Sequence, residues 1–251
     1  MEFVFLNAGN GFMGFYGFPG MFYRMDPTYS LVVIGAVICM IASANVSRSF
    51  SKYSRYGCKR GTTGAQAAEK ILHDAGIYDV QIRHISGDLT DNYNPGNKTL
   101  NLSDSVYGSS SIAAVGVAAH ECGHAIQHAR GYAPLSFRTA LVPIANLGSK
   151  LSWVFIIAGL IFSFNGLLIN IGIIMFSAAV LFQLVTLPVE FDASARALKL
   201  LSSTGIMNNS EVSQTKKVLS AAAMTYVAAA ATAILQLVRL IILFGGRNDR
   251  D

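Results

Sequence analysis

Three residues in one short segment have the types and spacing typical of a catalytic metal site: His120, Glu121 and His124. They form the pattern HExxH within the stretch AAHECGHAIQH, whose residues favour an α-helix. Residues four apart on a helix project from one face about 6 Å apart along its axis, so the two histidines can hold one Zn²⁺. Glu121 lies beside them, where its carboxylate can act as a general base on a water molecule. The pattern predicts metal-assisted peptide hydrolysis, against the alternative of a chance match whose histidines pair or face solvent.

A third histidine close to the motif is excluded as a ligand. In the longer pattern HExxHxxGxxH, Gly and His would stand where this chain has Gln127 and Arg130. His128 continues the spacing of four, but on a straight helix it lies about 12 Å from His120 and cannot share one ion with both motif histidines. We therefore expect His128 behind the metal site or at the surface.

The third ligand is expected further along the chain. Between the motif and the last three residues the chain contains three carboxylates: Glu190, Asp192 and Glu211. Glu190 is favoured because it follows Pro188 at the end of a long apolar stretch, in a segment whose small residues permit close helix packing. A cysteine ligand is not expected, since Cys122 lies two residues after His120 and points to the opposite face of the helix.

Composition indicates a membrane protein, with 52% hydrophobic and only 13% charged residues and a mean hydropathy of +0.44. Three stretches are long and almost free of charge: residues 29–46, 151–189 and 218–244, the last with the single charge Arg239. Asn165 and Gly166 form a turn signal inside the second stretch, so it predicts two helices. The sequence therefore predicts about four transmembrane helices.

These helices divide the chain into seven expected parts. They are an N-terminal extension (1–28), transmembrane helix 1 (29–46), a zincin-like α+β domain with the HExxH helix (47–147), a transmembrane hairpin (148–189), a third-ligand helix and cytoplasmic segment (190–217), transmembrane helix 4 (218–244) and a tail (245–251).

The basic residues predict the orientation in the membrane. Fifteen of the nineteen lysines and arginines lie between Arg48 and Lys217, and the loop inside the hairpin has none. By the positive-inside rule, residues 47–147 and 190–217 face the cytoplasm. The basic excess, with a pI near 9.2, fits this topology and anionic lipid headgroups, and no nucleic-acid recognition motif accompanies it. The lipid bilayer is thus an expected partner, and nucleic acid is not.

The zincin-like domain is expected to follow the order helix, strand, strand, active-site helix. Residues 64–75 are expected to form a helix that Thr62 and Thr63 can cap, with Ala68, Ile71 and Leu72 as its apolar stripe. Residues 80–85 alternate as a strand, and residues 109–111 can cap the motif helix. A second strand is expected at Lys98, Thr99, Leu100, Asn101 and Leu102, and we assign to it the sheet edge that pairs with an extended substrate. The candidate stabilisers of the transition state are Tyr93, Tyr107 and Arg196.

The chain resembles the YugP-type membrane zinc metallopeptidases of bacteria, from about Asp26 to Phe244. The resemblance is carried by DPTY, GTTGAQAAEKIL, LTDNYNPGNKTLNLSDSVYGSSSIAAVGVAAHECGHAIQH and LPVEFDASARAL. These enzymes are related more distantly to HtpX-type and CAAX-prenyl-protease zinc enzymes. The resemblance implies a protease in the cytoplasmic membrane.

The family pattern also implies a glutamate ligand on a later helix, carried here by Glu190. Relatives usually have an aspartate four residues beyond that glutamate, which orients a ligand histidine. This chain has Ser194 there and Asp192 two residues after Glu190, so either side chain could take that part.

Two functions from different classes remain. The first is a zinc endopeptidase with one Zn²⁺ per chain, which cleaves membrane-associated proteins or peptides near the cytoplasmic membrane surface. The alternative is a non-catalytic zinc-binding membrane scaffold or transporter subunit. The enzyme is favoured, because a structural zinc site is normally closed by four protein ligands, whereas three ligands and an adjacent glutamate leave a position open for water.

Overall fold

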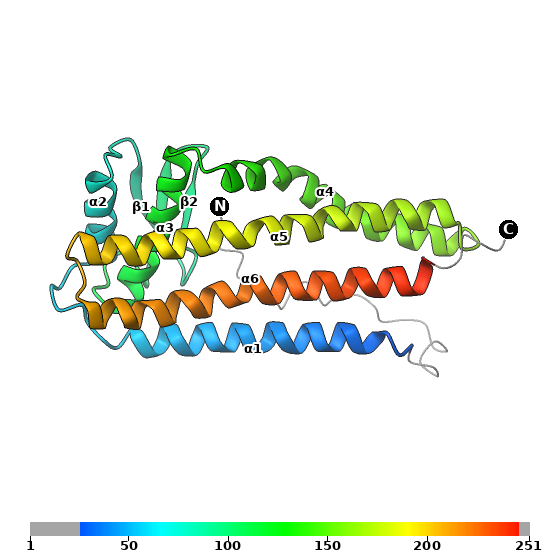
Figure 1. Cartoon of the computed structure of the whole chain (residues 1–251), viewed down its shortest axis with the longest axis horizontal. Helices are drawn as coiled ribbons and strands as arrows, with labels where there is room; N and C mark the ends of the chain where they lie inside the picture. Colours follow the sequence, from blue (N-terminus) through cyan, green and yellow to red (C-terminus); the bar gives the residue numbers. More distant parts are fainter. Residues whose placement is uncertain (1–25, 246–251) are drawn as a thin grey trace. The chain divides into compact units, whose positions relative to one another are not determined.

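The computed structural model describes residues 26–245 of the 251-residue chain. In chain order its elements are α1 (Tyr29–Tyr53), α2 (Gly64–Asp74), β1 (Gln81–Ile85), β2 (Asn92–Asn94), β3 (Thr99–Ser103), α3 (Ile112–Ala129), α4 (Ala133–Ile161), α5 (Gly166–Ser203) and α6 (Asn209–Phe244) (Figure 1). The expected N-terminal extension and C-terminal tail lie almost wholly outside the described residues.

The described residues divide into two compact units. One consists of residues 44–132 and 190–223 and contains the HExxH motif; we name it the motif unit. The other consists of residues 26–43, 133–189 and 224–245, and we name it the span unit. Three helices, α1, α5 and α6, contribute residues to both units.

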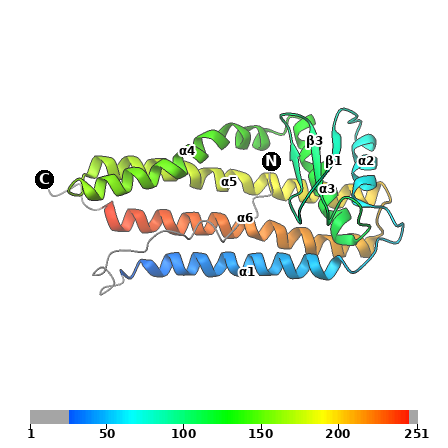
Figure 2. The ribbon, with the colours of Figure 1, turned by 180° about the vertical axis from the view of Figure 1, so that it is seen from behind.

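The motif unit is built on a three-stranded sheet with the order β1-β3-β2, which lies beside α2 and α3 (Figure 2). Strand β3 is central, parallel to β1 and antiparallel to β2. Its Leu100 and Leu102 are fully buried among apolar side chains of α2 and α3. The sheet and the two helices thus form one hydrophobic core.

Local sequence determines where the two helices of this core begin. The Thr63 hydroxyl accepts the backbone N–H of Gln66, and the Gln66 side chain accepts the N–H of Thr63, which makes a capping box for α2. The Ser111 hydroxyl accepts the N–H of Ala114 at the start of α3. Gly76, with φ of +76°, follows the end of α2 in the left-handed conformation that glycine adopts without strain.

The span unit consists of long apolar helix segments. Within the described residues, α1, α4, α5 and α6 are each long and apolar enough to cross a membrane. In both views α6 lies between α1 and α5 (Figures 1 and 2). Large apolar side chains such as Met40, Ile161 and Ile174 are exposed, as expected of surfaces that face lipid. The chain therefore has the fold of a helical membrane protein with a small α+β domain.

One prediction about the sheet is wrong. The segment from Lys98 to Leu102 was expected to form the edge that pairs with substrate, but Thr99–Ser103 is the central strand, with β1 on one side and β2 on the other. Lys98 precedes the strand, with φ of +52°. The error arose because the three-residue strand β2 is too short to give an alternating pattern, and β2 is the edge strand on that side.

Candidate metal centre

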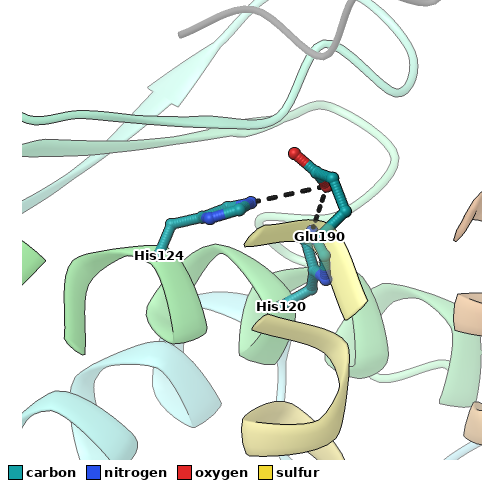
Figure 3. Close-up of side chains that lie close together, drawn as sticks. All are labelled: His120, His124 and Glu190. Carbon is teal, nitrogen blue, oxygen red and sulfur yellow. Dashed lines mark ion pairs between the residues drawn. The ribbon is translucent and has the colours of Figure 1, made fainter. Parts of the chain in front are cut away.

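Three buried side chains from two helices converge on one point in the motif unit. His120 and His124 belong to α3, and Glu190 to α5 (Figure 3). Glu190 Oε2 lies 3.3 Å from His120 Nε2 and 3.7 Å from His124 Nε2. One donor atom from each residue falls within 4.8 Å of the others, and all three residues are buried. The structure thus brings together the three residues that the sequence predicts as metal ligands.

The donor set fits a zinc ion. Ligand atoms bound to zinc at about 2.0–2.1 Å with tetrahedral angles lie roughly 3.3–3.5 Å apart, and the two measured separations of 3.3 and 3.7 Å are close to this value. Two imidazoles and one carboxylate are also the protein ligands of a known class of catalytic zinc site, in which a fourth position stays open.

Close packing of α3 against α5 makes this convergence possible. A Cβ atom at Gly123 would lie 2.6 Å from the backbone oxygen of Ala193, closer than real Cβ atoms come. Gly123 stands between the two motif histidines, and Ala193 follows Glu190 by three residues. The glycine therefore lets the backbone of α5 approach the face of α3 that carries the imidazoles.

Each imidazole forms a hydrogen bond through Nδ1, the ring nitrogen that does not face Glu190, and the partner differs between the two histidines. His120 Nδ1 lies 3.1 Å from Ser194 Oγ. His124 Nδ1 lies 3.0 Å from Gln127 Oε1, and Gln127 Nε2 donates to Asp192 Oδ2 at 2.8 Å. In both histidines Nδ1 is thus engaged, and Nε2 faces Glu190. This is the arrangement in which Nε2 is available to a metal.

Glu121 lies in the same buried region but outside the ligand cluster. It is only 2% exposed, and its Oε1 atom has no hydrogen-bond partner among the described residues. Burial raises the pKa of Glu121 to about 8, although positive charge on His124 and a backbone hydrogen bond from Tyr93 act in the opposite direction. A buried carboxyl with a raised pKa beside a cluster of possible metal ligands is typical of a catalytic group.

The two other carboxylates considered as ligands have different contacts. Asp192 Oδ2 also accepts a hydrogen bond from Arg196 Nε. Glu211 accepts the backbone N–H groups of Lys59 and Asn208 at the start of α6. Neither carboxylate belongs to the cluster of possible metal ligands found among the described residues.

The candidate stabilisers are distributed around the motif unit. Tyr93 is 3% exposed, and its hydroxyl lies 2.8 Å from His128 Nδ1, at the last turn of α3. Tyr107 lies elsewhere, because its ring centre is 5.1 Å from that of His84, with the ring planes tilted by 44°, and it lines a groove with residues of α2 and β1. The Arg196 guanidinium lies 5.6 Å from the centre of the Tyr132 ring. Of these three residues, Tyr93 is the one that contacts Glu121, through a backbone hydrogen bond to the carboxylate.

Sequence reasoning did not assign a part to Gln127 or Gly123. Gln127 served only to exclude the longer histidine pattern, yet it is fully buried and contacts a motif histidine. Its position three residues after His124, on the same face of the helix, could have indicated the contact. Gly123 gave no comparable indication, since its importance depends on the helix that packs against it.

The chain belongs to the family described as "Putative neutral zinc metallopeptidase", which it matches over residues 28–245. A membrane-embedded zinc peptidase is the class of protein that this family, the fold and the ligand cluster together define. The chain is 44% identical over 211 residues to the "Putative membrane protease YugP" of Bacillus subtilis (strain 168). The matched region covers 84% of this chain and 92% of that protein. No significant match was found among solved structures. The four candidate spans and this relative make the chain a multi-pass membrane protein.

Proposed function

We propose that this protein is a zinc-dependent endopeptidase whose metal is held by His120, His124 and Glu190, with Glu121 as the general base. The observation that supports this most directly is the buried cluster of two imidazoles and a carboxylate, with Glu121 next in sequence to one of its members. The match to a zinc metallopeptidase family agrees with it. One Zn²⁺ per chain suffices for this ligand set.

The ion, when bound, supplies a Lewis acid that polarises the scissile carbonyl and makes water more acidic. The chain supplies the rest. Glu121 accepts a proton from the attacking water and later passes it to the leaving amine. Because burial raises the pKa of this carboxyl to about 8, a nearby dication is needed to favour the ionised form that can accept a proton.

The substrate backbone is proposed to lie along β2. This strand is an edge of the described sheet, and a backbone hydrogen bond links its Tyr93 to Glu121. An extended peptide added to such an edge would bring its carbonyl groups close to the general base. On its other side β2 is paired with Thr99, Leu100 and Asn101 of β3, which hold it in the sheet.

The site is proposed to face the cytoplasm, close to the membrane surface. The concentration of lysine and arginine between Arg48 and Lys217 supports this orientation. Residues 151–189 contain no charge, and Glu190 follows directly after them, on the same helix α5 as residues 166–189. Proteins or peptides held at the membrane are therefore the proposed substrates, rather than freely soluble ones.

The decisive experiment compares Glu121→Gln with the unchanged protein, in detergent or lipid nanodiscs. The variant should keep about one zinc per chain, because Glu121 is not a ligand, and should lose peptide-bond cleavage by at least about 10³-fold. Proteomics of membranes from cells that make either form would supply the substrates. Glu69→Gln, on the exposed side of α2, is the matched control and should behave like the unchanged protein.

Two results would reject the proposal. If Glu121→Gln cleaved the same membrane proteins at the same rate, Glu121 would not be the base. If both forms carried zinc and neither cleaved any protein, the non-catalytic zinc-binding scaffold or transporter subunit would be the better account.

A further inference from the structure

Four side chains form a continuous line of contacts that begins at one motif histidine and ends at a guanidinium. His124 Nδ1 contacts Gln127 Oε1 at 3.0 Å, and Gln127 Nε2 contacts Asp192 Oδ2 at 2.8 Å. Arg196 Nε donates to the same Asp192 oxygen at 2.5 Å. Gln127 is fully buried, while the side chains of Asp192 and Arg196 are about a quarter exposed, at 28% and 26%. The line therefore runs from the buried site towards the surface.

The Asp192 carboxylate determines the direction of the hydrogen bonds between it and His124. An ionised carboxylate can only accept, so the Gln127 group that faces Asp192 must be the amide NH₂. The Gln127 oxygen must then face His124, and since it too can only accept, His124 Nδ1 must carry the proton. A neutral imidazole with its proton on Nδ1 has its lone pair on Nε2, which is the atom that faces Glu190.

We propose that Gln127 and Asp192 are positioning residues that fix the tautomer and the ring orientation of His124 for metal binding. The function of this arrangement rests on the proposed zinc site. The proton on Nδ1 does not, because it follows from the contacts of Gln127 and Asp192, although without a metal ion the Glu190 carboxylate near Nε2 is a competing acceptor for that proton. In the contacts that the structure shows, Asp192 reaches His124 through Gln127.

The other motif histidine is held by a group that does not impose a direction. Ser194 Oγ lies 3.1 Å from His120 Nδ1, and a hydroxyl can either donate or accept. This contact is therefore compatible with both tautomers of His120. The two ligand histidines therefore differ at Nδ1, because the contact of His124 requires a proton there and the contact of His120 does not.

Helix geometry explains why Ser194 contacts His120, whereas Asp192, two residues earlier on α5, is linked to His124. Ser194 lies about 40° around the helix from Glu190, so both face His120. Asp192 lies about 200° from Glu190 and about 40° from Arg196, on another side of α5. Gln127, one turn beyond His124, spans the distance from that side to the imidazole.

Nitrogen NMR of ¹⁵N-histidine in the metal-free protein tests the tautomer, and the five histidines of the chain allow assignment by substitution. The spectrum is recorded near pH 8.5, about two units above the ordinary pKa of a free imidazole. His124 should be protonated on Nδ1 in the unchanged protein. In Gln127→Met, which keeps the length of the side chain but neither polar group, His124 should shift towards protonation on Nε2. Gln214→Met on α6 is the matched control and should leave His124 as it is.

Asp192 offers a second pair of variants on another helix, which keeps the test valid even if Gln127→Met folds poorly. Asp192→Asn can still present an oxygen to Arg196 and Gln127, so the Nδ1 proton should remain. Asp192→Leu removes the acceptor, lets the Gln127 amide turn over, and should give a mixture of tautomers. Zinc affinity, measured by competition with a chelator, should fall about 10- to 100-fold in Gln127→Met and stay within about threefold in Asp192→Asn.

The inference would be overturned if Gln127→Met kept both the Nδ1 proton of His124 and the zinc affinity of the unchanged protein. It would also be overturned if Asp192→Asn lost the Nδ1 proton as Asp192→Leu does, since an oxygen at that position would then not set the direction. An unchanged protein that binds no zinc would reject the proposed function, while the spectra of the metal-free forms would still decide the tautomer.

Discussion

The motif unit and the span unit bury very different groups. All the buried carboxylates of the described chain lie in the motif unit: Asp91, Glu121, Glu190 and Glu211. The described part of the span unit buries mainly apolar and small residues, with Arg138, Ser152 and Thr186 as its buried polar residues. A buried carboxylate costs free energy unless other groups pair with it. Because the buried carboxylates all lie in the motif unit, chemistry, and not stability alone, is inferred to determine which residues are buried there.

In both units, nevertheless, a glycine allows two helices to pack closely. Gly123 in the motif unit approaches the oxygen of Ala193, and Gly172 in the span unit approaches the oxygen of Ser152. A Cβ atom would lie 2.6 Å from the first oxygen and 2.8 Å from the second. The comparison leads to one expectation: the same substitution should affect metal binding in one unit and only stability in the other.

The largest effect is expected from Glu190→Ala. Removal of one of three ligands should lower zinc affinity by orders of magnitude, about 10³-fold or more, as measured by metal content and chelator competition. Glu211→Ala is the matched control, because Glu211 is also buried in the motif unit but accepts backbone N–H groups at the start of α6. It should lower the free energy of unfolding by about 1 kcal/mol and keep the zinc affinity. The opposite pattern would mean that the ligand assignment is wrong.

Gly123→Ala should have the next largest effect. The added methyl group must push α5 away from α3, which should lower the free energy of unfolding by about 1–3 kcal/mol. Because α5 carries Glu190, zinc affinity should fall in the same variant. Thermal unfolding with and without chelator measures both quantities. Zinc affinity equal to that of the unchanged protein would show that the close approach of the helices is not needed for the site.

Gly172→Ala is the corresponding change in the span unit. It should lower the thermal stability in detergent by a similar amount, because the methyl group would meet the backbone of α4. The zinc affinity of the folded fraction should stay unchanged. Gly57→Ala controls for the substitution itself, since nothing lies within 4 Å of a Cβ atom there. A loss of zinc affinity in Gly172→Ala would contradict the separation of the two units.

The smallest effect is expected from Ser194→Ala. It removes the hydroxyl behind His120 but leaves the ligand, so zinc affinity should fall by about tenfold or less. Ser202→Ala, on an exposed part of the same helix, is the control. An effect as large as that of Glu190→Ala would mean that Ser194 does more than hold the imidazole.

Local signals predicted much of the motif unit. The caps at Thr63 and Ser111 fixed the starts of α2 and α3, because a cap is a contact between residues close in sequence. The HExxH pattern likewise depends on a single helix. Glu190 could be favoured because few carboxylates follow the motif, so a non-local contact was reached by elimination.

What the sequence did not predict depends on contacts between distant segments. The edge position of β2 follows from the order of three strands, which a strand of three residues does not reveal. The line from His124 through Gln127 to Asp192 joins α3 to α5, and no spacing within either helix indicates it. The long helices also extend beyond the apolar stretches, since α1 and α6 continue into polar sequence.

The continuity of α5 has a consequence for which changes of length the chain can tolerate. Gly166–Ser203 is a single helix, so each residue inserted or deleted between Gly166 and Glu190 turns the carboxylate by about 100° relative to the apolar segment before it. The turn before the helix is different, because Ser163 and Phe164 already adopt positive φ and no helical phase passes through them. Natural insertions and deletions should therefore accumulate in that turn and be absent from the first two thirds of α5. The number of residues in the apolar segment of α5 thus sets the direction in which Glu190 projects from that helix.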